Sequence, residues 1–167
     1  GIRLIPALRE RGAKQVELIG NWKRLGDYEI SADKLAGERQ RLGIEPDDLV
    51  VTYIGTLDPT REMLPLLDAV CESPGVKLIV GGRGILQAEV EQAAQKSHNI
   101  IWLGWVDLMD VPLYTHLADV IYHCRAMDKF QEKNFIAPAA NKVFEAFAAG
   151  KPLMASRGIN EVADILE

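Results

Sequence analysis

The stretch Leu49 to Val80, "LVVTYIGTLDPTREMLPLLDAVCESPGVKLIV", decides the fold. It begins and ends with short runs that are apolar on both faces, and the segment between them has apolar residues at helical spacing. The order strand, helix, strand predicts two parallel strands, because parallel strands need a crossover connection and buried ones read as continuous apolar runs. We therefore expect a βαβ unit in this stretch.

The same alternation continues to the end of the chain. Further strand-length apolar runs and further segments with helical spacing follow one another in turn. The expected strands are 49–55, 76–80, 100–103, 119–123 and 152–156, and the expected helices are 61–73, 85–97, 109–118 and 141–150. This order predicts an α/β fold with a doubly wound, Rossmann-like parallel sheet covered on both faces.

Before this alternation, residues 2–12 are typical of a helix and residues 14–20 of a short strand, and Ser31 is the expected cap of another helix. We interpret the polar stretch 21–29 as a linker. At the other end, the chain stops inside or just after a helix that we expect from Gly158 onward.

Composition narrows the classes of function. The chain has 167 residues, of which 48% are hydrophobic, and a formal net charge of -5, which argues against a nucleic-acid surface. Cys71 and Cys124 form no CxxC pair, so the sequence suggests neither a zinc site nor a disulfide framework and favours the reducing cytoplasm. No apolar run reaches the roughly 18 residues of a membrane span. We expect a cytoplasmic protein with at most peripheral contact with the inner membrane face.

The loops after the strands are the candidate sites, because ligands bind outside the carboxyl ends of the strands in an open parallel sheet. Gly55 and Thr56 end the first strand, and Thr60 and Arg61 stand at the expected start of the next helix, where anions bind. The alternative is that Thr60 only caps that helix and Arg61 is a solvated charge. The "GGRG" of residues 81–84 is a loop without side-chain bulk or only a tight turn.

The later strand ends carry an aromatic residue and a single carboxylate. Trp105 and Val106 follow the third strand, where their backbone could pair with a base and the ring could pack on it, although Trp105 fits a core anchor equally well. A long connection separates the fourth strand from a helix for which Asn141 is the expected N-cap. Glu145 then lies one turn into this helix, where it can accept hydrogen bonds from two neighbouring hydroxyls.

Five segments together resemble a known family. In this order and spacing, "GTLDPTR", "LIVGGRG", "NIIWLGWV", "LADVIYH" and "NKVFEAFAAGKPLMAS" resemble the donor-binding domain of the family 4 retaining glycosyltransferases, which have the GT-B fold. The resemblance covers residues 45–165. It implies that Glu145 binds the ribose hydroxyls of a nucleotide-diphosphate sugar and that Arg61 and Lys142 share the charge of the diphosphate. It also includes Gly55, Thr56, Gly82, Trp105, Val106 and Asn141 in the donor site.

The sequence departs from that family at two positions. Ala137 stands where the family usually has a glutamate that contacts the transferred sugar, and Thr56 stands where it usually has an arginine. No catalytic residue is assigned. The resemblance implies metal-independent transfer, and no carboxylate pair is spaced to hold a divalent ion at a strand end. We therefore predict no metal and no cofactor, with the nucleotide sugar as a substrate.

The resemblance also implies that two domains share the reaction, one binding the donor and the other the acceptor. Residues 1–30 would be the end of an N-terminal domain and the linker, and residues 31–167 a C-terminal donor-binding domain that is incomplete at its C-terminus. A saccharide or lipid-linked acceptor would bind to the N-terminal domain. On this expectation the isolated chain binds a sugar nucleotide weakly and is inactive in transfer.

Four other classes of protein are alternatives to the glycosyltransferase. A dinucleotide-binding domain needs G-x-G-x-x-G after the first strand, and residues 55–60 do not fit it. A phosphoacceptor signalling domain needs acidic residues at early strand ends that hold Gly55 and Gly81 instead, and no histidine lies near a nucleophile elbow. A catalytically silent doubly wound nucleotide-binding module remains the alternative, because of Ala137.

Overall fold

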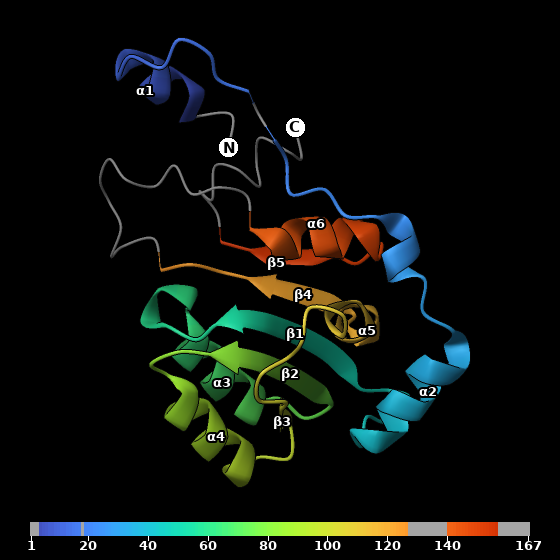
Figure 1. The fold of residues 1–167 in the computed structure, drawn as a ribbon. Helices are drawn as coiled ribbons and strands as arrows, with labels where there is room; N and C mark the ends of the chain where they lie inside the picture. The colour runs from blue at the N-terminus through green and yellow to red at the C-terminus, as the bar shows by residue number, and fades with distance from the viewer. Residues whose placement is uncertain (1–3, 18, 127–139, 157–167) are drawn as a thin grey trace.

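The computed structural model describes residues 4–17, 19–126 and 140–156 (Figure 1). Helices and strands alternate along these residues as the sequence pattern predicts. In chain order they are α1 (Leu4–Glu10), η1 (Leu25–Tyr28), α2 (Ala32–Arg41), β1 (Leu49–Thr56), η2 (Pro59–Arg61), α3 (Met63–Cys71), β2 (Val76–Arg83), α4 (Gln87–Lys96), β3 (Ile100–Trp102), α5 (Val111–Leu117), β4 (Val120–His123), α6 (Asn141–Ala148) and β5 (Leu153–Ala155).

The strands form one sheet in the order β3-β2-β1-β4-β5, and each neighbouring pair is parallel. This arrangement confirms the predicted doubly wound α/β fold. The chain winds outward from β1 through β2 to β3 and then returns to place β4 on the other side of β1. The sheet therefore has its topological switch point between β1 and β4, where a crevice opens at the carboxyl ends of the strands.

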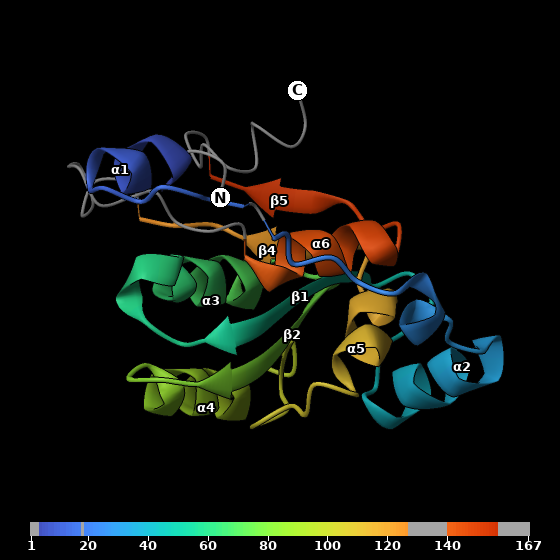
Figure 2. The same ribbon diagram turned by 45° about the horizontal axis from the view of Figure 1, so that its top comes forward.

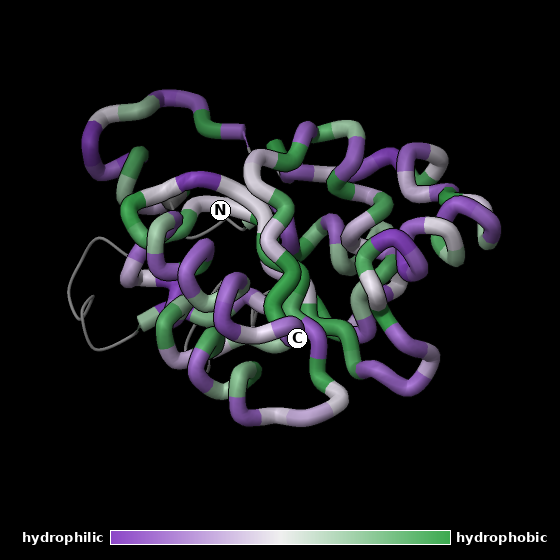
Figure 3. The backbone as a smooth tube through the Cα atoms, turned by 90° about the horizontal axis from the view of Figure 1, so that it is seen from below, coloured by the Kyte–Doolittle hydropathy of each residue, from purple (hydrophilic) through white to green (hydrophobic). Residues whose placement is uncertain are grey.

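Helices cover both faces of the sheet, with α3 and α4 on one side and α2 and α5 on the other (Figure 2). Successive strand residues point to opposite faces, so each strand contributes to two core clusters. Tyr53 and Leu78 pack with α3 and α4, whereas Val50 and Ile79 pack with Leu117 of α5. The strands form the hydrophobic centre of the molecule in Figure 3.

Strands β1 and β2 run further than the sequence pattern suggested, as far as Thr56 and Arg83. The predicted loop at "GGRG" is therefore wrong, since its first three residues belong to β2 and pair with β1. Gly82 has φ +136°, and a Cβ atom there would lie 1.8 Å from the carbonyl oxygen of Gly55. Glycine is required at this position because the two backbones meet too closely for a side chain.

Helix starts differ from the prediction at two of three places. Ser31 caps α2 as expected, because its hydroxyl accepts a hydrogen bond from the amide of Lys34 at 3.3 Å. Asn141 is not a cap, because Ala140 is the N-cap of α6 and Asn141 is its first residue. Thr60 is not a cap either. The carboxylate of Asp58 accepts its amide hydrogen bond at 2.8 Å and so caps the short turn η2.

The interpretation of the first 30 residues is partly correct. Helix α1 lies within the predicted range, but the described residues of the expected strand at 14–20 pair with no strand of the sheet. The expected linker contains the 3-10 turn η1. Ala137, most of the long connection after β4 and the helix expected from Gly158 lie outside the described residues. Across the residues that the structure describes, no helix has the length and apolar character needed to cross a membrane.

Candidate functional site

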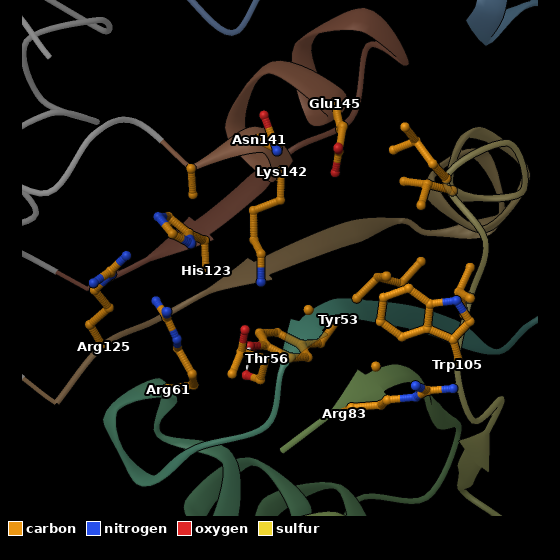
Figure 4. A pocket seen from close by; sticks show the side chains of 17 residues that line it. Tyr53, Thr56, Arg61, Arg83, Trp105, His123, Arg125, Asn141, Lys142 and Glu145 are labelled. Atoms are coloured by element: carbon orange, nitrogen blue, oxygen red, sulfur yellow. Dashed lines mark hydrogen bonds between the residues drawn. The ribbon is translucent and has the colours of Figure 1, made fainter.

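A cleft of about 400 Å³ opens at the carboxyl ends of β1, β2 and β4, between these strands and the start of α6 (Figure 4). All nine residues that the sequence analysis placed in the donor site line this cleft. They are Gly55, Thr56, Arg61, Gly82, Trp105, Val106, Asn141, Lys142 and Glu145. The fold thus brings together residues that are up to 90 positions apart, at the switch point where ligands of such sheets bind.

The cleft is positively charged although the chain as a whole is negative. Among the residues that the structure describes, its lining includes Arg61, Arg83, Arg125 and Lys142 but a single carboxylate, Glu145. A concave surface with an excess of one charge concentrates ligands of the opposite sign. The cleft is therefore suited to an anion that also offers polar groups to one carboxylate.

Lys142 is held at the start of α6 with its ammonium group inside the protein. Its Nζ atom lies 3.5 Å from the centre of the Tyr53 ring, in a cation–π contact, and it faces Gly55 across the cleft. Burial of the ammonium, together with the positive charge of Arg61, lowers the pKa of Lys142 from its ordinary value to about 7. An anion bound beside it would favour the charged form and raise this pKa again.

The start of α6 offers further room for an anion. The N-cap residue Ala140 makes no side-chain hydrogen bond to the helix, and the first turn contains no acidic residue. The first amides of a helix point out of its N-terminus and carry a partial positive charge. The ammonium group of Lys142 and these amides therefore both attract an anion to the start of α6.

Glu145 lies one turn further along α6 and is buried, with its side chain directed into the cleft (Figure 4). Its Oε1 atom pairs with Nζ of Lys23 at 3.0 Å. Lys23 comes from the segment that the sequence analysis treated as a linker. A buried carboxylate is stable only when it is paired or hydrogen-bonded, and Lys23 provides that partner.

Two further cationic side chains, Arg61 and Arg125, lie together at one end of the cleft, with His123 beside them (Figure 4). Arg61 Nε lies 3.3 Å from the carboxylate of Asp58, which holds the guanidinium at the end of β1. Burial and the charges of Lys142, Arg125 and Arg61 lower the pKa of His123 to about 3. His123 is therefore neutral at physiological pH and can donate a hydrogen bond without adding charge.

Trp105 is 60% exposed at the mouth of the cleft, so its alternative reading as a core anchor is wrong. The guanidinium carbon of Arg83 lies 4.7 Å from the centre of its ring, and its indole nitrogen donates to Asp107 at 3.3 Å. Val106 is buried instead. A Cβ atom at Gly81 would lie 2.5 Å from the Val106 side chain, so this valine packs directly under β2.

The predicted set missed four polar or charged residues that line the cleft, and one that pairs with Glu145 beside it: Tyr53, Arg83, His123, Arg125 and Lys23. Arg83, His123 and Arg125 stand at or just after the ends of β2 and β4, so the rule that ligands bind at strand ends could have found them. Tyr53 is hidden within a strand whose residues all look like core. Lys23 has no local signal, because only the folded chain brings it to α6.

Within the described residues, no group of three or more histidine, cysteine, aspartate or glutamate side chains could hold a metal ion. The absence of a metal and a cofactor from the reaction stays a prediction.

Comparison with known proteins assigns the family. The family model described as "Glycosyl transferases group 1" matches residues 48–167. The chain belongs to this family. Among curated proteins, this group 1 glycosyl transferase chain is 28% identical over 130 residues to TuaH, a glycosyltransferase assigned to teichuronic acid biosynthesis in Bacillus subtilis (strain 168). The match covers 77% of this chain and 32% of TuaH, so the chain spans about a third of that relative.

Solved structures share the fold at low sequence identity. HepE of Anabaena, solved with UDP and glucose, has a TM-score of 0.70 and 23% identity over 91% of this chain and 41% of HepE. Sucrose-phosphate synthase from Thermosynechococcus elongatus has a TM-score of 0.66 and 22% identity, over 93% of this chain and 39% of that enzyme. WaaG, a glycosyltransferase of lipopolysaccharide biosynthesis, has a TM-score of 0.61 and 20% identity, over 90% of this chain and 40% of WaaG. The described fold is therefore the Rossmann-like domain of GT-B glycosyltransferases.

Proposed function

We propose that the cleft binds the nucleoside diphosphate part of a UDP-sugar and that the chain is the donor-binding domain of a retaining glycosyltransferase of family 4. The observation that carries this proposal is the convergence of four cationic side chains and one buried carboxylate on a single cleft at the switch point of the sheet. UDP is the favoured nucleotide because HepE, which shares the fold, was solved with UDP and with UDP-glucose.

In this proposal Glu145 binds the ribose. A carboxylate has about four acceptor positions, and Lys23 occupies one of them, so the two vicinal hydroxyls of a ribose can both donate to it. Hydrogen bonds to a charged acceptor are stronger than those between neutral groups. Glu145 therefore recognises the ribose of the nucleotide and has no role as a catalytic acid or base.

Arg61 and Lys142 bind the diphosphate in the same proposal, with Arg125 beside them. Departure of the nucleoside diphosphate leaves negative charge on its oxygens, and fixed cations stabilise that charge as it develops. His123 lies among these cations as a neutral donor. Because arginine and lysine provide the charge that a metal ion provides elsewhere, we propose metal-independent transfer.

The base would lie at the mouth of the cleft, beside the exposed Trp105 and the backbone of Val106. The volume of about 400 Å³ is within the range of pockets that hold small ligands. The transferred sugar and its acceptor need surfaces beyond these residues. We propose that the acceptor, a saccharide or a lipid-linked saccharide, is held by a facing domain of the kind that two-domain GT-B enzymes have.

The test is a panel of UDP, GDP, ADP and TDP, with and without a glucosyl group, together with uridine, measured by thermal shift and titration calorimetry. A ligand that binds only the folded state raises the apparent stability by mass action. We expect UDP and UDP-glucose to raise the melting temperature of the chain and uridine to have little effect. If no nucleotide binds, the proposal is wrong. Binding of UDP-glucose by an assembled enzyme that never transfers the sugar would instead favour the silent binding module.

A further inference from the structure

The segment before η1 lies against α6 (Figures 1 and 2). The start of α6 lines the cleft that we propose holds the nucleotide. Two consecutive residues of this segment contact two consecutive residues of the helix. The ring of Trp22 meets that of Phe144 edge to face, with 5.4 Å between their centres, and Nζ of Lys23 lies 3.0 Å from Oε1 of Glu145. These contacts join parts of the chain that are more than 120 positions apart.

We propose that Lys23 is a positioning residue of the nucleotide site. It neutralises the carboxylate of Glu145 so that Glu145 stays directed at the ribose and Lys142 stays available for the diphosphate. The inference rests on the proposed function and extends it to a segment outside the residues that the family model matches.

Helix α6 carries one lysine and one glutamate at a spacing that favours their pairing. Lys142 and Glu145 are three positions apart, which places them on the same face of the helix, where opposite charges attract each other. If the two side chains formed an ion pair with each other, neither charge would be available to a ligand. In the structure they are separated instead, because Lys142 lies over the ring of Tyr53 and Glu145 pairs with Lys23.

Burial makes the partner of Glu145 important. The side chains of Lys23 and Glu145 are only 19% and 10% exposed, so the pair is largely removed from water. A buried charge that loses its partner is strongly unfavourable, and the remaining group turns to any other opposite charge within reach. For Glu145 the nearest such group on its own helix is Lys142. Removal of Lys23 would therefore disturb both the binding of the ribose by Glu145 and the binding of the diphosphate by Lys142.

The position of Lys23 is fixed by contacts on both sides of it. Trp22 packs on Phe144 of α6, and the following turn η1 is anchored by Tyr28, which is buried and whose carbonyl oxygen bonds to the ring of His116 in α5. The segment thus spans from α6 to α5. Because the segment is anchored on both sides of Lys23, this lysine can hold the Glu145 carboxylate in one orientation. A lysine on a free surface would leave the carboxylate mobile.

The test compares the affinity of the chain for UDP and for 2′,3′-dideoxy-UDP by titration calorimetry. The ratio of the two dissociation constants measures how well Glu145 recognises the ribose hydroxyls, and we expect about tenfold to a hundredfold in the unaltered chain. Lys23→Met should lower this ratio at least about fivefold, because truncation of a buried charge pair leaves the other charge without its partner. Lys23→Arg, which keeps the charge, should restore most of it.

Two further variants separate the possible failures. Arg24→Met removes an exposed cation from the same segment and should leave the ratio unchanged, and Glu145→Gln should remove the discrimination. If Glu145→Gln removes it while Lys23→Met keeps the full ratio, the positioning role is wrong and the proposed function stands. A lowered ratio that Lys23→Arg does not restore also contradicts the positioning role. If the unaltered chain does not bind UDP, or binds both nucleotides equally, the proposed function and this inference fail together.

Discussion

The charge state of Lys142 gives the sharpest test of the proposed diphosphate site. Its pKa is lowered to about 7 in the free cleft, so about half of the molecules carry a neutral lysine at pH 7. A diphosphate beside the ammonium favours the charged form, so the pKa of Lys142 rises when the ligand binds. Binding must therefore take up protons, and affinity must fall as the pH rises above 7.

The size of the pH effect on affinity follows from the populations of charged and neutral Lys142 in the free protein. Between pH 6 and pH 8 the charged fraction of a lysine with pKa about 7 falls from about nine-tenths to about one-tenth. If the lysine remains charged in the complex throughout this range, affinity falls by about tenfold. At pH 7 the uptake is about half a proton for each ligand bound.

The measurement is titration calorimetry with UDP-glucose, because neither phosphate of a sugar diphosphate ester titrates in this range. Runs at pH 6, 7 and 8 give the affinity, and runs at pH 7 in two buffers with different heats of ionisation give the proton uptake. Lys142→Arg is the matched control, because its guanidinium stays charged and should make the affinity independent of pH. His123 does not contribute to the slope, since its pKa of about 3 keeps it neutral.

Three outcomes would refute this reasoning. The first is an affinity that is the same at pH 6 and pH 8 in the unaltered chain. The second is release of protons on binding. The third is a slope that persists unchanged in Lys142→Arg, which would assign the titration to another group in the cleft.

The remaining predictions concern other parts of the site and the sheet. Glu145→Ala should weaken UDP binding about tenfold to a hundredfold in calorimetry while far-UV circular dichroism stays the same, and unchanged affinity would remove its ribose role. Arg61→Ala should weaken UDP binding at least about tenfold and uridine binding much less, whereas equal losses would place it away from the diphosphate. Gly82→Ala should cost about 1 to 3 kcal/mol in the free energy of unfolding measured in urea, because its Cβ would lie 1.8 Å from a carbonyl oxygen of β1. Gly37→Ala on the open surface of α2, with nothing within 4 Å of the added Cβ, should instead be neutral or stabilising, and equal losses for the two variants would contradict the packing argument.

The doubly wound parallel fold could be predicted from the sequence, because the regular alternation of strand and helix leaves few topologies. The order of the strands in the sheet was not predicted and comes from the structure. The central residues of the apolar runs, for example Val50–Tyr53 in β1, are buried on both faces of the sheet, and a continuous apolar run of this kind is typical of a parallel strand. The ends of the elements were predicted less well. Pro59 and the left-handed residue Glu62 turn the chain once before α3 begins, and a helix pattern in the sequence does not show where such a turn ends.

The site was predictable to the extent that its residues follow strand ends. Arg61 and Trp105 lie in the connections that follow strands, and Glu145 stands out as one carboxylate in an apolar stretch. The fold brings them to one cleft because the carboxyl ends of parallel strands meet at one edge of the sheet. Tyr53 could not be recognised, since a tyrosine in a buried strand looks like core until the structure shows Lys142 over its ring.

Lys23 was unpredictable for a different reason, and that reason connects the segment before η1 with the charge of the site. The cleft must be positive when it holds a nucleotide sugar, yet four cations facing one another without a ligand repel. The structure lowers this repulsion in two ways, because burial makes the charge of Lys142 easy to lose and Glu145 provides a negative charge nearby. If Glu145 were paired with Lys142, the same carboxylate would oppose diphosphate binding. A second cation, brought from a distant part of the chain, removes this conflict by giving the carboxylate its own partner, so that ligand binding has only to return a proton to Lys142.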